Sequence, residues 1–243
     1  MGPQIVSKAV LLVWTNLGAA VRATALPFAL IAALPFLLLT GSGDGVGRSF
    51  ASMGMILVLS AILFAWAATS WHRYVLLHEE PSIVPMPGAP AIIGYLWAGI
   101  RVGMVAVVLM LVVALVFSII GSTLVAVFGE GLWLLALAGF GISVLVSYVL
   151  LRLSLILPAA ALGRAMSLGE SWSATSRARD AVLVTALLVS LLQFLLQMVG
   201  TALPRAGVPG LLLSLTVTWA SAMIGLSVLT ALYGVLVEGR SVD

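Results

Sequence analysis

Two histidines and two glutamates are the first residues in this chain that could perform chemistry. His72, His78, Glu79 and Glu80 lie close together, and imidazole and carboxylate groups are common ligands of divalent metal ions. The two histidines are six positions apart, so a continuing helix would point them to different faces, and the chain has no other histidine. The spacing favours capping and solvation of a helix end, and no motif supplies a nucleophile with a positioned base. The sequence therefore predicts no metal site, no cofactor and no catalytic residues.

Two arginines at the ends of long apolar stretches are stronger candidates for a site. Arg73 closes one such stretch, and Arg152 lies within another, one helical turn after Tyr148. A guanidinium group at the membrane centre costs at least ~2.5 kcal/mol, so it either faces the helix bundle or extends to the headgroups. We predict that Arg73, Arg152 and Tyr148 form an anion site, for which a phospholipid headgroup is the natural ligand. Simple extension of each arginine to the cytoplasmic headgroups is the alternative.

A stripe of polar residues follows later in the chain. Its members, spaced by three, four and four positions, are Ser190, Gln193, Gln197 and Thr201. This spacing places them on one face of a helix, and because lipid offers no partner to an amide group, that face should point into the bundle. Hydrogen bonding between helices is the favoured role of the stripe, and the lining of a substrate path is the alternative.

The elements that must position these residues are membrane-spanning helices. Hydrophobic residues make up 63% of the 243 residues and charged residues only 8%, and the mean hydropathy of +1.25 excludes a soluble globular fold. A helix needs about 20 residues to cross a hydrocarbon core of ~30 Å, and six charge-free stretches are long enough. The predicted spans are 23–43, 49–71, 102–129, 131–151, 181–204 and 206–237.

Three other segments are expected to lie at the membrane interface, each before a pair of spans. Residues 9–21 are interrupted by Asn16 and are too short to cross the bilayer. Residues 81–100 contain four prolines, whose missing backbone donors hydrocarbon cannot replace, so we expect a loop that leads into an interfacial helix. Residues 164–180 are the most polar part of the chain and indicate a third interfacial helix.

The distribution of cations predicts the orientation. Arg48 and Arg205 fall in predicted outer turns, whereas the other nine of the eleven Lys and Arg residues lie on or near the opposite side. Such an excess marks the cytoplasmic side of short loops. We therefore expect a multi-pass protein of the bacterial inner membrane with both termini in the cytoplasm. The net charge of +3 is explained by this orientation and does not indicate a nucleic-acid partner.

Several landmarks recur at close to one third of the chain length. Arg73 and Arg152 are 79 residues apart, although a further 80 positions reach Leu232 and not an arginine. Interfacial tryptophans and Gly-Ser or Gly-Thr pairs recur in the same order, and chance is the alternative explanation. We predict an all-α fold of six transmembrane helices in three hairpin repeats, each preceded by an interfacial amphipathic helix. The predicted units of this single membrane domain, 1–243, are about 1–80, 81–163 and 164–243.

Two segments carry a resemblance to known proteins. They are Trp71-His72-Arg73-Tyr74-Val75-Leu76-Leu77 before an acidic-proline turn, and Arg152-Leu153-Ser154-Leu155-Ile156-Leu157-Pro158-Ala159. The chain resembles the YciC-like bacterial inner-membrane proteins and the membrane domain fused to some glycerophosphodiester phosphodiesterases. The resemblance covers nearly the whole chain and implies a six-helix integral membrane domain without a particular activity. The phosphodiesterase barrel has no counterpart here, so its activity is not expected.

Function is predicted from a basic cytoplasmic side without a catalytic set. We expect a non-enzymatic accessory protein that binds anionic membrane lipids, a larger membrane-protein complex, or both. A transporter or lipid-moving protein is the alternative, motivated by the repeat and the polar stripes, although only the fourth span carries an internal ionisable group for ion coupling. An intramembrane enzyme that uses His72 and the Glu79-Glu80 pair is the third reading.

Overall fold

The computed structural model describes residues 1–39, 46–80, 88–128, 132–202 and 207–241, and its regular structure in these ranges is entirely helical. Two short helices, α6 and α7, stand between the fourth and fifth long ones. The elements are α1 (Gly2–Thr15), α2 (Leu17–Leu39), α3 (Val46–Leu77), α4 (Ala89–Phe128), α5 (Leu132–Leu153), α6 (Ile156–Ala161), α7 (Leu168–Ser176), α8 (Arg179–Ala202) and α9 (Gly207–Leu236).

Six segments of these helices are long and apolar enough to cross a membrane. They belong to α2, α3, α4, α5 continued into α6, α8 and α9. The prediction of an all-α, multi-pass membrane protein with six candidate spans is therefore confirmed at the level of length and composition.

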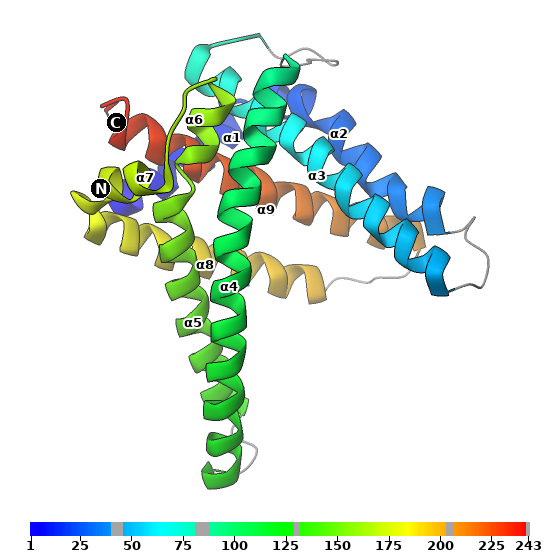
Figure 1. Cartoon of the computed structure of the whole chain (residues 1–243), viewed down its shortest axis with the longest axis vertical. Coiled ribbons are helices and arrows are strands. Elements are labelled where there is room, and N and C mark those ends of the chain that lie inside the picture. The colour runs from blue at the N-terminus through cyan, green and yellow to red at the C-terminus, as the bar shows by residue number, and fades with distance from the viewer. Residues whose placement is uncertain (40–45, 81–87, 129–131, 203–206, 242–243) are drawn as a thin grey trace.

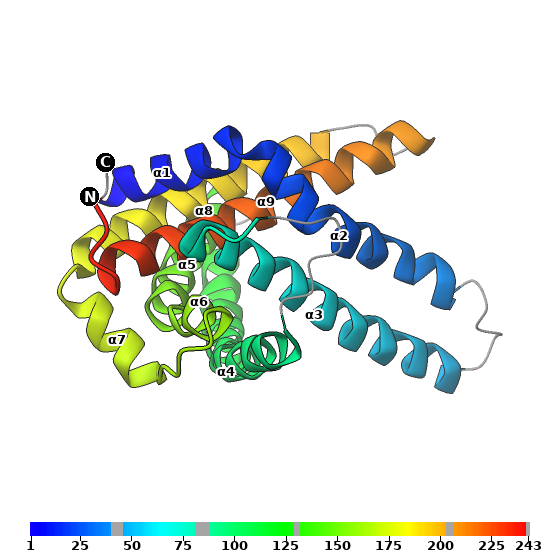
Figure 2. The ribbon, with the colours of Figure 1, turned by 90° about the horizontal axis from the view of Figure 1, so that it is seen from above.

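The spans form three antiparallel hairpins that diverge from a common base (Figure 1). In this view the hairpin of α4 and α5 extends downwards from the base, whereas the hairpin of α2 and α3 extends to the right. Seen from above, α1, α8 and α9 lie side by side, and α4 is nearly end-on (Figure 2). Both chain termini lie at the common base, which we call the hub: the region where α1, α6 and α7 meet the adjoining ends of the spans.

The buried core lies in the hub. One cluster contains residues of α1, α5, α8 and α9, and a second contains residues of α2, α3, α4 and α9. Large members of the two clusters are Ile5, Leu155, Leu232, Trp71 and Met223. Both clusters also contain buried alanines. Small residues let helix backbones approach where lipid provides no hydrophobic force for association.

Helix α1, expected as an amphipathic lead-in, is docked on protein. Its buried residues Gly2, Ile5, Ala9 and Val13 recur every three to four positions, and the helix contacts α8 and α9. A Cβ atom on Gly2 would lie 2.8 Å from the Ala181 carbonyl oxygen of α8, so only glycine permits this approach. One face of α1 is therefore part of the hub.

The second expected interfacial helix is not separate from its span. Helix α4 begins at Ala89 and continues for 40 residues without a break. Pro90 is its second residue, a position where the missing N–H has no helical partner to lose. Three other prolines of the segment 81–100, Pro81, Pro85 and Pro87, lie outside the described residues.

The fourth span is interrupted at its hub end. Helix α5 ends at Leu153, and α6 follows from Ile156, because Pro158 lacks the N–H that would bond to the Ser154 carbonyl. The chain then turns at Gly163, whose φ of 73° suits glycine, and leads to α7. This turn brings the most polar segment of the sequence back onto the spans.

Helix α7 begins with a capping box. The Ser167 backbone N–H donates to Glu170 Oε2 (2.6 Å), and the Glu170 N–H donates to Ser167 Oγ (3.2 Å). The hydrogen bonds from the Ser167 backbone and side chain lower the pKa of the Glu170 carboxyl. Because the pKa is lowered on folding, the contribution to stability is present above the unfolded value of about 4.3 and is lost as the pH falls through the folded value.

This capping box predicts a pH-dependent difference between the wild type and Glu170→Gln. Glutamine retains an acceptor for the Ser167 N–H but cannot take up the proton. As the pH falls from about 6 to about 3, the wild type should lose stability relative to the variant. Thermal unfolding of both proteins in one detergent, followed by circular dichroism, measures the difference; a constant gap over this range would contradict the prediction.

Candidate anion-binding site at the hub

Arg152 lies in the last turn of α5 and is enclosed by α7. Its side chain is 7% exposed, and its Nε donates to Thr175 Oγ1 (3.1 Å). One Nη donates to the Trp172 carbonyl (3.0 Å) and to Ser176 Oγ (2.6 Å), and the other to the Tyr148 hydroxyl (3.3 Å). The guanidinium carbon also lies 3.5 Å from the centroid of the Trp172 ring. The cation is therefore satisfied by neutral oxygens and an aromatic face.

These contacts make Arg152 a positioning residue for α7. The Ser171 hydroxyl of α7 donates to the Arg152 carbonyl (2.7 Å), so both the backbone and the side chain of Arg152 hold the short helix. The sequence correctly placed Tyr148 beside Arg152, because residues four apart on a helix are neighbours. The acceptors on α7 could not be anticipated, since they lie 20 to 24 positions away.

Arg73 has different partners. It forms a bidentate ion pair with Glu79 and donates to the Ala161 carbonyl at the end of α6 (3.2 Å). His78, with a φ of 57°, turns the chain after α3. This turn places the Glu79 carboxylate against the Arg73 guanidinium group. Among the described residues, the predicted pair is thus divided: Arg73 bonds to α6 and Arg152 to α7.

His72 is buried and bonded within the hub. Its Nδ1 lies 2.8 Å from Thr230 Oγ1, and because that hydroxyl donates to the Leu226 carbonyl (2.7 Å), it accepts from Nδ1–H. The ring lies against Tyr95, with 5.8 Å between centroids. No group of three or more His, Cys, Asp or Glu residues in the described ranges could hold a metal ion.

The polar stripe on α8 is used for contacts between helices in its first half. Ser190 Oγ donates to Ser147 Oγ of α5 (3.0 Å), and Gln193 Nε2 donates to the Ser221 carbonyl of α9 (3.1 Å). Gln197 is exposed, and the side chain of Thr201 lies outside the described part of the structure. Ser190 and Gln193 thus join α8 to its two neighbours.

A cavity of about 580 Å³ brings together three arginines that the sequence did not connect. Arg73 comes from α3, Arg101 from α4 and Arg164 from the turn after α6, and no described lining residue is acidic. Gly94 and Ala160, on facing walls, leave room between α4 and α6. The cavity is the best candidate for binding an anion, because guanidinium groups recognise phosphate and carboxylate oxygens.

The three arginines differ in their existing bonds. Arg73 is paired with Glu79, and one Nη of Arg164 donates to Glu238 Oε1 (3.1 Å). Arg101 has no ion pair within the described residues, and its buried Nε has no hydrogen-bond partner there. The sequence offered one signal that was missed: Gly94, Trp97 and Arg101 are spaced to share one face of a helix.

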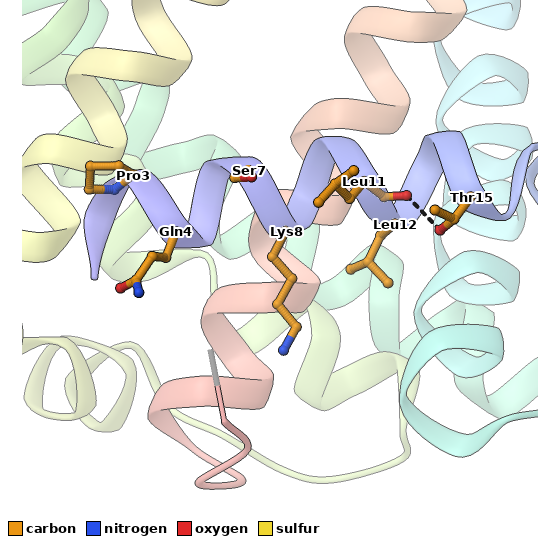
Figure 3. A pocket seen from close by; sticks show the side chains of 7 residues that line it. All are labelled: Pro3, Gln4, Ser7, Lys8, Leu11, Leu12 and Thr15. Atoms are coloured by element: carbon orange, nitrogen blue, oxygen red, sulfur yellow. Dashed lines mark hydrogen bonds between the residues drawn. The ribbon is translucent and has the colours of Figure 1, made fainter. Parts of the chain in front are cut away.

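A second hollow, of about 500 Å³, lies open along one face of α1 (Figure 3). Lys8 is the one charged residue among its described lining residues, and Lys8 Nζ donates to the Ser241 carbonyl near the C-terminus (2.6 Å). Figure 3 shows Gln4, Lys8 and Leu12 projecting from the same side of the helix. With one cation and one wall, this groove is a weaker anion site than the cavity with three arginines.

The Arg152 contacts predict a stability difference between Arg152→Lys and the wild type. A lysine retains the charge but cannot reproduce the planar fork or its stacking on Trp172. We expect Arg152→Lys to lower the free energy of unfolding by at least ~1.5 kcal/mol, measured by denaturant titration in detergent. Arg177→Lys, at an exposed arginine that follows α7, is the matched control and should change little. Equal losses in the two variants would contradict a positioning role for Arg152.

The guanidinium groups around the cavity are chemically suited to an anion. Family models, curated proteins and solved structures were each compared with the chain, and none of them matches it.

Proposed function

We propose that the chain is a non-enzymatic protein of the bacterial inner membrane that binds anionic lipid through its hub, as an accessory component of a larger membrane complex. The observation that carries the proposal is the surplus of cations at the hub. Arg22, Arg101 and Arg177 form no ion pair among the described residues, whereas two of the hub carboxylates, Glu79 and Glu238, are already paired with arginines. Anionic headgroups are the partners that a membrane offers to such groups.

Exposed tryptophans support a position of the hub at headgroup level. Trp14 of α1 is 76% exposed, and Trp97 of α4 is 60% exposed. Tryptophan is enriched where the hydrocarbon core meets the headgroups, because its ring is apolar and its N–H is polar. Cations beside these rings are therefore within reach of lipid phosphates.

Binding has more support than catalysis. His72 is enclosed and bonded to Thr230, and Glu79 is held by Arg73, so neither group is placed to transfer a proton to a bound molecule. The charged side chains that line the cavity are guanidinium groups, which donate hydrogen bonds to an anion and remain protonated at neutral pH.

We propose further that the three hairpins are tandem units related by an axis along the membrane normal. Support comes from Arg73 and Arg152, which lie near the ends of the returning helices of the first two hairpins. Each donates to a backbone carbonyl of a short helix, at Ala161 and Trp172. In the third hairpin, Arg240 lies beyond the end of α9 and donates to the Leu76 carbonyl of α3 (2.6 Å).

The cytoplasmic position of the hub predicts the labelling of Ser173→Cys. The chain has no native cysteine, and Ser173 is exposed on α7. A membrane-impermeant maleimide should leave this variant unlabelled in intact spheroplasts and label it after permeabilisation. Val208→Cys, at the exposed start of α9, the end of this helix away from the hub, should already be labelled in intact spheroplasts. Labelling of Ser173→Cys from outside would reverse the orientation.

The proposed function predicts enrichment of anionic lipid on the purified protein. If one arginine near the membrane surface contributes about 1 kcal/mol, the ratio of anionic to zwitterionic lipid on the protein should exceed that of the surrounding membrane by about fivefold. Mass spectrometry of lipids extracted from both samples measures the ratio, and a wash at high salt should lower it through screening. If the lipids on the protein have the same composition as those of the surrounding membrane, the proposal is wrong.

A further inference from the structure

We infer that the cavity between α4 and α6 is a specific site for the phosphodiester of an anionic, amine-free lipid. Arg73, Arg101 and Arg164 are the residues that bind it. This inference rests on the proposed function and gives it a location and a ligand class. Figure 1 shows α6 beside the hub end of α4, where the cavity lies.

One face of α4 builds the wall of the cavity. Pro90, Gly94, Trp97 and Arg101 recur every three to four residues and all line it. Gly94 lies opposite Ala160, where an added Cβ would be 3.8 Å from the Ala160 carbonyl oxygen. Arg101 lies two turns, about 10 Å, further along the span than Gly94. The cavity thus combines a hollow between small residues with a cation on its membrane side.

The charge of the cavity selects the class of anion. Arg73 is paired with Glu79, and Arg164 shares Glu238 with Arg240. Arg101 has no carboxylate partner in the described ranges. The cavity therefore keeps a net positive charge, which attracts the negative charge of a phosphodiester. The donors that remain on Arg73 and Arg164 can still bond to phosphate oxygens, because each guanidinium group has five.

The surroundings of the cavity indicate a lipid. Beyond Arg101, α4 presents exposed apolar side chains, among them Met104, Val107 and Leu111. An acyl chain attached to a phosphate in the cavity would lie along this surface, beside Trp97 at the entrance. No described lining residue is acidic, so an ammonium headgroup would have no ionic partner on the cavity wall. Phosphatidylglycerol has the required chemistry, and phosphatidylethanolamine lacks it.

The test uses native mass spectrometry of the full chain in detergent, titrated with phosphatidylglycerol or phosphatidylethanolamine. Arg101→Gln removes the unpaired cation, and Gly94→Leu fills the hollow while leaving every charge in place. Arg179→Gln and Gly99→Leu are matched controls, because Arg179 is exposed and paired with Asp180, and Gly99 lies on α4 with open space around it; neither lines the cavity. Inorganic phosphate is added as a competitor to separate a lipid from a free anion.

We expect wild type to prefer phosphatidylglycerol, and both cavity variants to weaken its binding by roughly tenfold, the effect of losing charge-assisted hydrogen bonds. The controls should stay within about twofold of wild type, and all variants should melt at similar temperatures. Inorganic phosphate at the lipid concentration should not displace the lipid, because it lacks acyl chains.

Three distinguishable outcomes would each contradict part of the proposal. If wild type prefers phosphatidylglycerol and the two cavity variants bind it equally well, the lipid lies elsewhere on the hub: the cavity assignment is wrong and the proposed function stands. If wild type shows no preference, the proposed function is wrong as well. If inorganic phosphate displaces phosphatidylglycerol at equal concentration, the ligand of the cavity is a free anion and not a lipid.

Discussion

A guanidinium group inside a membrane protein must find its acceptors within the protein, and around Arg152 this requirement organises the hub. The side chain reaches four oxygens and one aromatic ring, and most of them belong to α7. A short helix that begins with a capping box, and has little apolar surface, is thereby held against α5. The contacts with α7 offset the free-energy cost of removing the Arg152 cation from water. The same contacts dock α7, which connects the second hairpin to the third.

The same principle explains why polar contacts are concentrated at one end of the molecule. Lipid provides no hydrophobic force between helices, so small residues and hydrogen bonds must hold the hairpins together. Trp71 Nε1 donates to Ser227 Oγ (3.0 Å), Trp219 Nε1 donates to Thr24 Oγ1 (2.9 Å), and the Tyr74 hydroxyl donates to Asn16 Oδ1 (2.8 Å). Each bond joins distant parts of the chain, whereas the described outer halves of the spans present apolar side chains outward.

The interruption after α5 serves both the packing and the candidate site. Pro158 separates α6 from α5, and Gly163 turns the chain so that Arg164 faces α4. Ala160 of α6 lines the cavity, and the Ala161 carbonyl accepts from Arg73. A continuous fourth span would have removed the turn that carries Arg164 to this position. The break is therefore the structural reason that three arginines from separate elements surround one hollow.

The sequence by itself determined the class of the fold and several local features. Long apolar runs with few charges can satisfy their backbone in lipid only as helices, so six spans followed from composition and length. Neighbours four apart on a helix, such as Tyr148 and Arg152, were equally accessible to sequence reasoning, because their contact needs only helical geometry. These features depend on residues that are close together in the chain.

Only the tertiary structure decided which arginines share a site. The equal spacing of Arg73 and Arg152 suggested a pair, yet among the described residues Arg152 is enclosed by α7 and Arg73 shares a cavity with Arg101 and Arg164. Hydrophobic periodicity predicts that a helix forms, but side-chain packing sets its rotation, its crossing angle and its neighbours. Those three quantities depend on contacts between residues far apart in the chain, and they determine where each guanidinium group points.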